Sequence, residues 1–175
     1  MFYTMMKIRV RLFQVATALL FVTFFSIHGG VMAQGDKNPV TVYSFDEFEY
    51  WLHKDTDSLY VINFWATWCA PCVKEIPHFE KIYDTYKDQK VKVVFVSLDH
   101  PGQIESRVLP FMERLDMQAR VLLLDDPNSN RWIPKVSDKW TGSIPATVIY
   151  NRDFRAFYER EFNYEELEEI ILPLL

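Results

Sequence analysis

The stretch that decides the fold is Trp65-Ala66-Thr67-Trp68-Cys69-Ala70-Pro71-Cys72-Val73-Lys74-Glu75-Ile76-Pro77. It contains both cysteines of the 175-residue chain, separated by two residues. The run before it, from Leu59 to Trp65, is almost wholly apolar, which is typical of a central strand buried on both faces. The residues after it place apolar side chains at helical spacing, namely Ile76, Phe79, Ile82 and Tyr83. The stretch is therefore expected to join a buried strand to the start of a helix.

A Cys-x-x-Cys pair at the start of a helix favours redox chemistry over a structural role. The first helical turn has backbone N–H groups without partners and carries the positive end of the helix dipole, so it stabilises a thiolate. The thiolate is the form that attacks disulfides. A structural disulfide with this spacing closes a very short loop, and the entropic gain from a disulfide grows with loop length. The spacing therefore suits thiol-disulfide exchange.

The N-terminal segment has the pattern of a secretory signal peptide. Lys7, Arg9 and Arg11 precede an apolar run, and Val31-Met32-Ala33 fits the small-residue cleavage site. We expect a signal peptide over residues 1–33, cleavage near Ala33, and one domain over residues 34–175 in the periplasm or another exported location. The alternative is an uncleaved anchor, but the run of about 16 residues is shorter than the roughly 20 of a spanning helix.

The composition excludes some classes of partner. The chain is 49% hydrophobic and 25% charged, as in ordinary globular proteins. Removal of residues 1–33 takes away three of the 19 basic residues and none of the 24 acidic ones, so the net charge changes from −5 to about −8. An acidic domain of this kind argues against nucleic acid as a partner. We also expect no direct membrane insertion after cleavage of the signal peptide.

Strands and helices alternate along the rest of the chain. Expected strands cover residues 40–43, 59–65, 91–98, 120–124, 146–150 and 154–160. Expected helices cover residues 45–52, the segment from Cys69 to about 86, 104–115 with an interruption near Pro110, a short piece through Trp132, Val136 and Trp140, and 164–172. A proline inside the second of these helices, Pro77, should kink it. This order predicts an α/β fold with a mixed sheet and helices on both faces.

From about Val40 onward the chain resembles the thioredoxin fold, and within it the exported TlpA/ResA-like thiol-disulfide oxidoreductases. The resemblance rests on the combination of Asn63 to Cys72, Glu75, Pro77 and the segment Gly142-Ser143-Ile144-Pro145-Ala146-Thr147. A lone Cys-x-x-Cys would be a weak signal, whereas this combination is specific. It implies a central mixed sheet flanked by helices, with an extra helix and strand (104–124) inserted before a cis-proline.

The resemblance assigns roles to the residues around the cysteines. It implies that Cys69 is the exposed nucleophile and Cys72 the buried resolving thiol, and that the two form a redox-active disulfide. Ala70 and Pro71 would tune the reduction potential through the geometry and the N–H groups around the thiolate. Trp68 would cover one side of the site, although plain packing is an equally simple role for an aromatic residue there.

The segment Ile144-Pro145 is expected to face the two sulfurs. The resemblance implies a cis peptide bond between these residues, with the Ile144 backbone pairing with an extended substrate segment. Taken from the residues alone, an ordinary trans proline before an edge strand is about as compatible with the sequence.

The acid of the site is expected at Glu75. Thioredoxins carry a buried Asp in the strand before the motif, but this chain has Asn63 there, which cannot take a proton. In the TlpA/ResA-like branch the acid follows the second cysteine by three residues, which is the position of Glu75. A poorly solvated carboxylate has a raised pKa and can shuttle a proton. The alternative is a surface glutamate paired with a lysine.

These features predict an exported thiol-disulfide oxidoreductase that acts as a reductant through a mixed disulfide. Its partners would be protein thiols or disulfides, for instance those of apocytochrome c in cytochrome c biogenesis, and a membrane protein that donates electrons. No cofactor and no metal is expected. Two alternatives stay open: a non-catalytic binding module with an inert disulfide, and a Cu(I)-handling protein that uses Cys69, Cys72 and a histidine.

Overall fold

The computed structural model describes residues 40–175, so the expected signal peptide and its cleavage site near Ala33 lie outside the described part. Six strands form one sheet in the order β1-β4-β3-β2-β5-β6. The strands β1, β4, β3 and β2 run parallel to their neighbours, β5 runs antiparallel to β2, and β6 runs antiparallel to β5. Their bounds are β1 Thr41–Tyr43, β2 Leu59–Trp65, β3 Val91–Ser97, β4 Arg120–Leu124, β5 Ala146–Tyr150 and β6 Arg155–Tyr158. The expected mixed sheet is confirmed.

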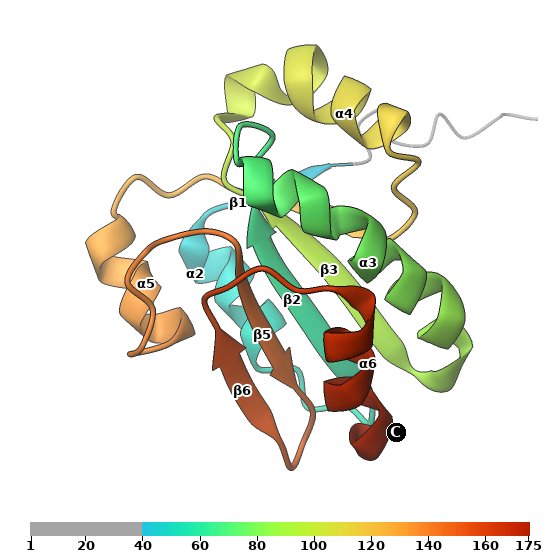
Figure 1. The fold of residues 1–175 in the computed structure, drawn as a ribbon. Helices are drawn as coiled ribbons and strands as arrows, with labels where there is room; N and C mark the ends of the chain where they lie inside the picture. Colours follow the sequence, from blue (N-terminus) through green and yellow to red (C-terminus); the bar gives the residue numbers. More distant parts are fainter. Residues whose placement is uncertain (1–39) are drawn as a thin grey trace, which may run out of the picture. The chain divides into compact units, whose positions relative to one another are not determined.

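Helices cover both faces of this sheet (Figure 1). One face is covered by α3 (Ala70–Tyr86), α6 (Tyr164–Ile171), a π-helical turn η4 (Ile104–Val108) and α4 (Leu109–Arg114). The other face is covered by α2 (Phe45–Phe48), the turn η1 (Glu49–Leu52) and α5 (Ser129–Val136). Three further single turns are η2 (Lys87–Gln89), η3 (Pro101–Gln103) and η5 (Leu172–Leu174). None of the helices within residues 40–175 is long and apolar enough to cross a membrane.

The strand β2 lies at the centre of the core. All seven of its residues are buried, as the apolar run predicts. Because side chains alternate between the two faces of a strand, Val61 and Trp65 pack under α3, whereas Ile62 and Phe64 pack under α2. The strand thus connects both hydrophobic layers and ends at the cysteine motif.

The structure differs from the expected elements at a few boundaries. The helix expected over 104–115 is a π-helical turn that continues directly into α4, and the change from one to the other falls next to Pro110, the second residue of α4. The helical piece expected to reach Trp140 ends at Val136, because Ser137 is extended. Trp140 is buried all the same, since it packs on Phe64 and Trp132.

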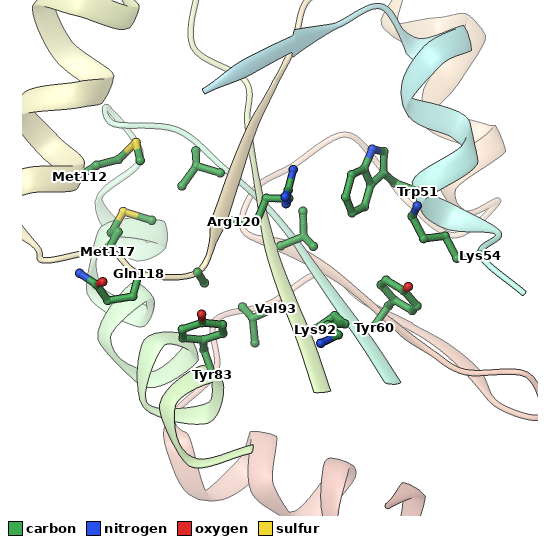
Figure 2. A pocket seen from close by; sticks show the side chains of 13 residues that line it. Trp51, Lys54, Tyr60, Tyr83, Lys92, Val93, Met112, Met117, Gln118 and Arg120 are labelled. Atoms are coloured by element: carbon green, nitrogen blue, oxygen red, sulfur yellow. The ribbon is translucent and has the colours of Figure 1, made fainter. Parts of the chain in front are cut away.

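The strands β3 and β4 begin at different levels, which leaves a step in the sheet at their amino ends. The first residue of β4, Arg120, pairs with Val94, so β3 begins three residues before its neighbour. A hollow of about 690 Å³ lies beside this step and is lined by side chains from both faces of the sheet. Figure 2 shows Trp51, Lys54 and Tyr60 on one side of it and Met112, Met117 and Gln118 on the other.

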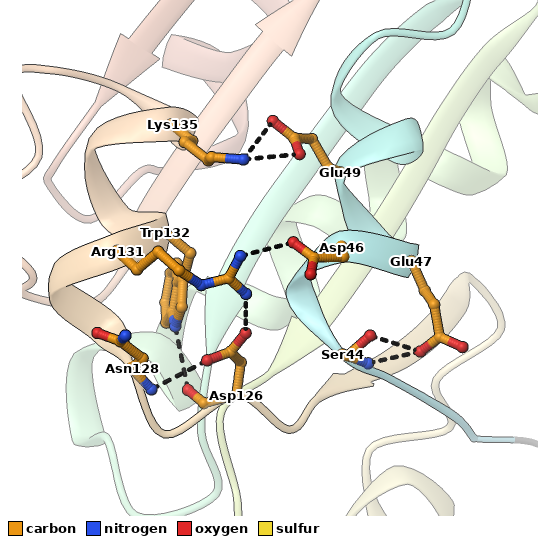
Figure 3. Close-up of polar contacts among 9 residues, drawn as sticks. All are labelled: Ser44, Asp46, Glu47, Glu49, Asp126, Asn128, Arg131, Trp132 and Lys135. Atoms are coloured by element: carbon orange, nitrogen blue, oxygen red, sulfur yellow. Dashed lines mark hydrogen bonds and ion pairs between the residues drawn. The ribbon is translucent and has the colours of Figure 1, made fainter.

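Polar contacts join α2 and η1 to α5 on the second face of the sheet (Figure 3). The Arg131 guanidinium donates hydrogen bonds to Asp46 and to Asp126, both at 2.6 Å. Lys135 pairs with Glu49 at 3.0 Å. At the start of α2, Ser44 and Glu47 form a capping box, in which the Glu47 carboxylate accepts from the Ser44 backbone N–H at 2.9 Å. The Ser44 hydroxyl also donates to this carboxylate at 2.7 Å. Exposed pairs of this kind contribute only about 0–1 kcal/mol each, so the buried aromatic residues between the elements carry most of the stability.

We expect Phe48→Ala to lower the free energy of unfolding by about 3–5 kcal/mol, because it opens a cavity in a well-packed core. Phe48 is fully buried and packs on Phe45 and Phe64. Urea denaturation followed by circular dichroism measures the change. The matched control is Tyr50→Ala, two residues further on, where the ring is 65% exposed and a loss of about 1 kcal/mol or less is expected. Equal losses in the two variants would contradict this assignment of the core.

Candidate active site

Cys69 and Cys72 form a disulfide at the amino end of α3. Cys69 is the N-cap residue, and its sulfur accepts a hydrogen bond from the Cys72 backbone N–H at 3.3 Å. The exposed fraction of Cys69 is 6%, whereas that of Cys72 is 0%. Both cysteines are therefore buried, and the exposure expected for Cys69 is not seen. Cys69 still keeps a small accessible area at the positive end of the helix dipole, so it is the more approachable of the two.

The Ile144–Pro145 segment lies directly across from this disulfide. Phe64 of β2 pairs with Ala146 of β5, so the antiparallel register carries Pro145 to the cysteine end of β2. The Ile144–Pro145 peptide bond is cis, as expected. The Ile144 carbonyl oxygen lies 3.6 Å from the Cys69 sulfur. The disulfide sulfur has no hydrogen, but the reduced Cys69 thiol can donate to this oxygen.

The loop before Pro145 is held by Glu159, which follows β6. The Glu159 carboxylate accepts hydrogen bonds from the backbone N–H groups of Thr141 and Ser143 at 3.0 and 2.9 Å, and from the Thr141 hydroxyl. Desolvation raises the pKa of Glu159, but these hydrogen bonds outweigh it and the pKa is lowered overall. Between the two held residues, Gly142 has a φ of +98°, a conformation that favours glycine. The loop that faces Cys69 is therefore fixed by a carboxylate.

Glu75 is completely buried between β2 and the segment after β6. Its carboxylate accepts hydrogen bonds from the Asn63 side-chain amide at 2.7 Å and from the Phe162 backbone N–H at 2.9 Å. Burial raises the pKa of Glu75 to about 7, although both hydrogen bonds act to lower it. The alternative of a surface glutamate paired with a lysine is therefore wrong. The adjacent Lys74 is exposed and pairs instead with Glu161.

Asn63 connects Glu75 to the strand that follows the cis-proline. Its side-chain amide nitrogen donates both to Glu75 and to the Thr147 hydroxyl, the latter at 3.1 Å. The Asn63 side-chain oxygen is buried and has no hydrogen-bond partner within residues 40–175. Asn63 therefore occupies the expected position and orients the acid, although it cannot itself exchange a proton.

A second buried carboxylate, that of Asp99, holds the loop before Cys69. Asp99 is only 2% exposed and accepts hydrogen bonds from the Thr67 backbone N–H at 2.9 Å, the Thr67 hydroxyl at 2.7 Å and the Ser97 hydroxyl at 2.9 Å. Ser97 ends β3, so this network joins the neighbouring strand to the cysteine loop. Asp99 therefore fixes the conformation of the loop that leads to Cys69.

The remaining predicted site residues lie at the surface around the disulfide. Trp68 is 63% exposed, so it is not a core residue. Ala70 and Pro71 are exposed on the first turn of α3. Ile144 is half-buried. As for metal ligands, no group of three or more His, Cys, Asp or Glu side chains within residues 40–175 is arranged to hold an ion.

Glu159, Asp99 and the Phe162 N–H were not identified from the sequence. Asp99 comes directly after the predicted strand 91–98 and two residues after Ser97, and this could have indicated a polar network at the strand end. Glu159 gives no such signal, because it lies 16 residues from Ser143 and reaches it only when β5 and β6 fold back as a hairpin. The role of the Phe162 N–H is invisible in the sequence, since every residue other than proline carries this group.

The sequence matches known proteins over part of its length. A model of the AhpC/TSA family matches residues 41–154, which is more than half of the chain. The thiol-disulfide oxidoreductase ResA of Halalkalibacterium halodurans is 37% identical over 90 residues, which cover 51% of this chain and 46% of that protein. The chain therefore aligns with about half the length of this curated relative.

Solved structures share the fold. StoA from Bacillus subtilis superposes with a TM-score of 0.52 at 24% identity, covering 65% of this chain and 82% of that structure. The thioredoxin-related protein from Neisseria meningitidis serogroup B gives a TM-score of 0.57 at 25% identity, covering 66% and 84%. The architecture is thus thioredoxin-like. Together with the family match over residues 41–154, this shows that the chain belongs to the AhpC/TSA family.

Proposed function

We propose that the protein is an exported thiol-disulfide oxidoreductase that reduces protein disulfides. The observation that carries this proposal is the Cys69–Cys72 disulfide at the start of α3, facing the cis-proline loop. A pair at a helix start, with the first cysteine slightly accessible and the second fully buried, suits attack by the first and resolution by the second.

The proposed reaction transfers two electrons from the dithiol to the substrate. The Cys69 thiolate attacks one sulfur of a substrate disulfide, the substrate S–S bond breaks, and the departing sulfur takes up a proton. The Cys72 thiolate then attacks the Cys69 sulfur of this mixed disulfide and releases the second substrate thiol. The product is the Cys69–Cys72 disulfide present in the structure. The Ile144 backbone would hold an extended substrate segment beside Cys69.

Glu75 would act as the proton acceptor for Cys72. It lies one helical turn after Cys72 on α3, so both side chains project from the same face of the helix. Its pKa of about 7 lets it exchange a proton near neutral pH. Asn63 and the Phe162 N–H would hold it in place.

The expected signal peptide supports an exported location, and the acidic domain favours protein partners over nucleic acid. A membrane electron donor would restore the dithiol, and apocytochrome c is one candidate substrate. The reductant role requires a reduction potential more negative than about −150 mV, since strong oxidants lie near −120 mV.

Cys72→Ala tests the reaction itself. We expect this variant to accumulate a covalent adduct with a protein disulfide substrate, because no second thiol is available to resolve the mixed disulfide at Cys69. Non-reducing gel electrophoresis and mass spectrometry measure the adduct. The control Cys69→Ser should form no adduct and should reduce no insulin. Reduction of insulin by Cys69→Ser would contradict the proposal and would favour a binding module.

Glu75→Gln tests the proposed proton acceptor. In the wild type we expect the rate of insulin reduction to rise through an inflection near pH 7, because the Glu75 carboxylate is present only above its pKa. In the variant the inflection should vanish and the rate at pH 8 should fall about 100-fold. Stopped-flow pH profiles measure both.

The control for this variant is Glu161→Gln, which removes a neighbouring carboxylate but should keep the inflection. Stability gives a second readout, because the folded protein favours protonated Glu75. The resulting stabilisation is complete below the ordinary pKa of 4.5 and is lost as the pH rises through about 7. Urea midpoints should therefore fall with pH across this range more steeply in the wild type than in Glu75→Gln. An unchanged inflection in Glu75→Gln would rule out the acceptor role.

Glu159→Gln tests whether the cis-proline loop positions the substrate. The variant loses one of two accepting oxygens and the charge, so we expect the KM for a protein disulfide to rise about tenfold, equivalent to about 1.4 kcal/mol. The reduction potential and the rate with a small aromatic disulfide should stay unchanged, because neither needs the loop. Glu165→Gln, an exposed residue of α6, is the matched charge control. A parallel loss with the small disulfide would show that Glu159 has only a structural role.

A further inference from the structure

The hollow beside the step in the sheet lies away from the cysteines. The cysteine motif follows the carboxyl end of β2, whereas the hollow is lined by residues near the amino ends of β2, β3 and β4, among them Tyr60, Lys92 and Arg120. Because these are opposite ends of parallel strands, a molecule bound in the hollow would not block Cys69.

Three cations at this hollow have no acidic partner. Lys54, Lys92 and Arg120 line it, and none of them forms an ion pair with another residue of the described range 40–175. No Asp or Glu is among the lining residues. The Lys54 ammonium lies 4.2 Å and the Arg120 guanidinium 5.5 Å from the centre of the Trp51 ring. In a chain with a net charge of −5, this is a local concentration of positive charge beside an aromatic surface.

The two sides of the hollow differ because they belong to opposite faces of the sheet. Lys92 and Arg120 precede Val94 and Leu122 by two residues, so all four side chains project to the face that α2 covers. Val93 projects to the opposite face, where Met112 and Met117 complete an apolar wall. Figure 2 shows the cations and the methionines on opposite sides of the strands.

An edge of β3 is open between these two walls. The pairing of β3 with β4 begins at Val94, so no strand of the described chain lies beside Lys92 and Val93 on that side. Such an edge presents backbone N–H and C=O groups to a further strand. A strand added there would direct alternate side chains to the cationic wall and to the apolar wall.

We propose that this hollow binds an extended segment of a partner protein in which acidic residues alternate with apolar ones. The acidic side chains would meet Lys54, Lys92 and Arg120, the apolar side chains would meet Val93, Met112 and Met117, and the backbone would pair with β3. Residues 1–39 of this chain are a less suitable occupant, because they carry four basic residues and one acidic residue. The positive charge of the hollow favours an acidic segment instead. The site is separate from the proposed redox reaction and does not depend on it.

The test is binding of a fluorescein-labelled, end-blocked octapeptide of alternating glutamate and leucine to the full chain, measured by fluorescence anisotropy. We expect saturable binding that weakens as salt is raised. A peptide of the same composition with four glutamates followed by four leucines, and a peptide with lysine in place of glutamate, should bind at least tenfold more weakly. Equal binding of the reordered peptide would contradict strand addition.

Charge reversal locates the site. Lys92→Glu and Arg120→Glu should each raise the Kd of the alternating peptide at least tenfold, because each places a carboxylate opposite the peptide's own. Lys139→Glu makes the same change at an exposed lysine after α5 and should leave the Kd unchanged. Insulin reduction should stay at the wild-type rate in all three variants. A uniform weakening by all three would show a general charge effect and overturn the site.

Backbone pairing can be tested separately from charge. Alternate residues of a strand direct their N–H groups to the same neighbour, so N-methylation of one alternate set of peptide residues should abolish binding and methylation of the other set should not. Equal tolerance of both sets would overturn the strand model. Full competition by millimolar inorganic phosphate would show a site for small anions only. A dimer in sedimentation that dissociates in Lys92→Glu would identify a second copy of this chain as the occupant and would also contradict the proposal.

Discussion

The antiparallel pairing of β2 with β5 is the constraint on which the site depends. Because Phe64 lies opposite Ala146, the end of the central strand and the cis-proline before β5 meet at one edge of the sheet. The cysteine loop and the Ile144 carbonyl are 75 residues apart in the chain, yet this register sets them 3.6 Å apart. A shift of one residue would turn the side chains of β5 to the wrong face, and the buried residues on both sides of the strand prevent it.

Three carboxylates fix the segments of the chain that meet at this edge of the sheet. Asp99 fixes the loop before Cys69, and Glu75 joins α3 to the chain after β6. Glu159, near the surface, fixes the loop before Pro145. Each accepts hydrogen bonds from backbone N–H groups, which satisfies loop donors that no strand or helix partner reaches. Burial raises the pKa of Glu75 to about 7, because it outweighs the two hydrogen bonds that the carboxylate accepts. This pKa fits the proton transfer proposed for Glu75.

The two ends of the parallel strands offer different chemistry. The carboxyl end carries the disulfide and the half-buried Ile144, on a surface where Trp68 is exposed. The amino end carries the hollow with three cations and two methionines. Both features follow from where the strands begin and end. The strand β2 ends close to the start of α3, which carries the disulfide, and β4 begins opposite the fourth residue of β3, which leaves room for the hollow. Under the two proposals above, one domain would contact a substrate at the carboxyl end and a second protein at the amino end.

The sequence by itself determined the central strand and the helix after Cys69, because local signals mark both. The order of strands and helices predicted the mixed sheet, and the resemblance to the TlpA/ResA-like branch pointed to Glu75. A seven-residue apolar run, a Cys-x-x-Cys pair at a helix start and a glutamate one turn later all lie within 17 residues. Only the tertiary structure decided which groups hold Glu75, why Glu159 reaches Ser143, and where β3 lies open. These contacts join residues that are far apart in the chain, and their geometry depends on strand register and loop length, which side-chain patterns do not encode locally.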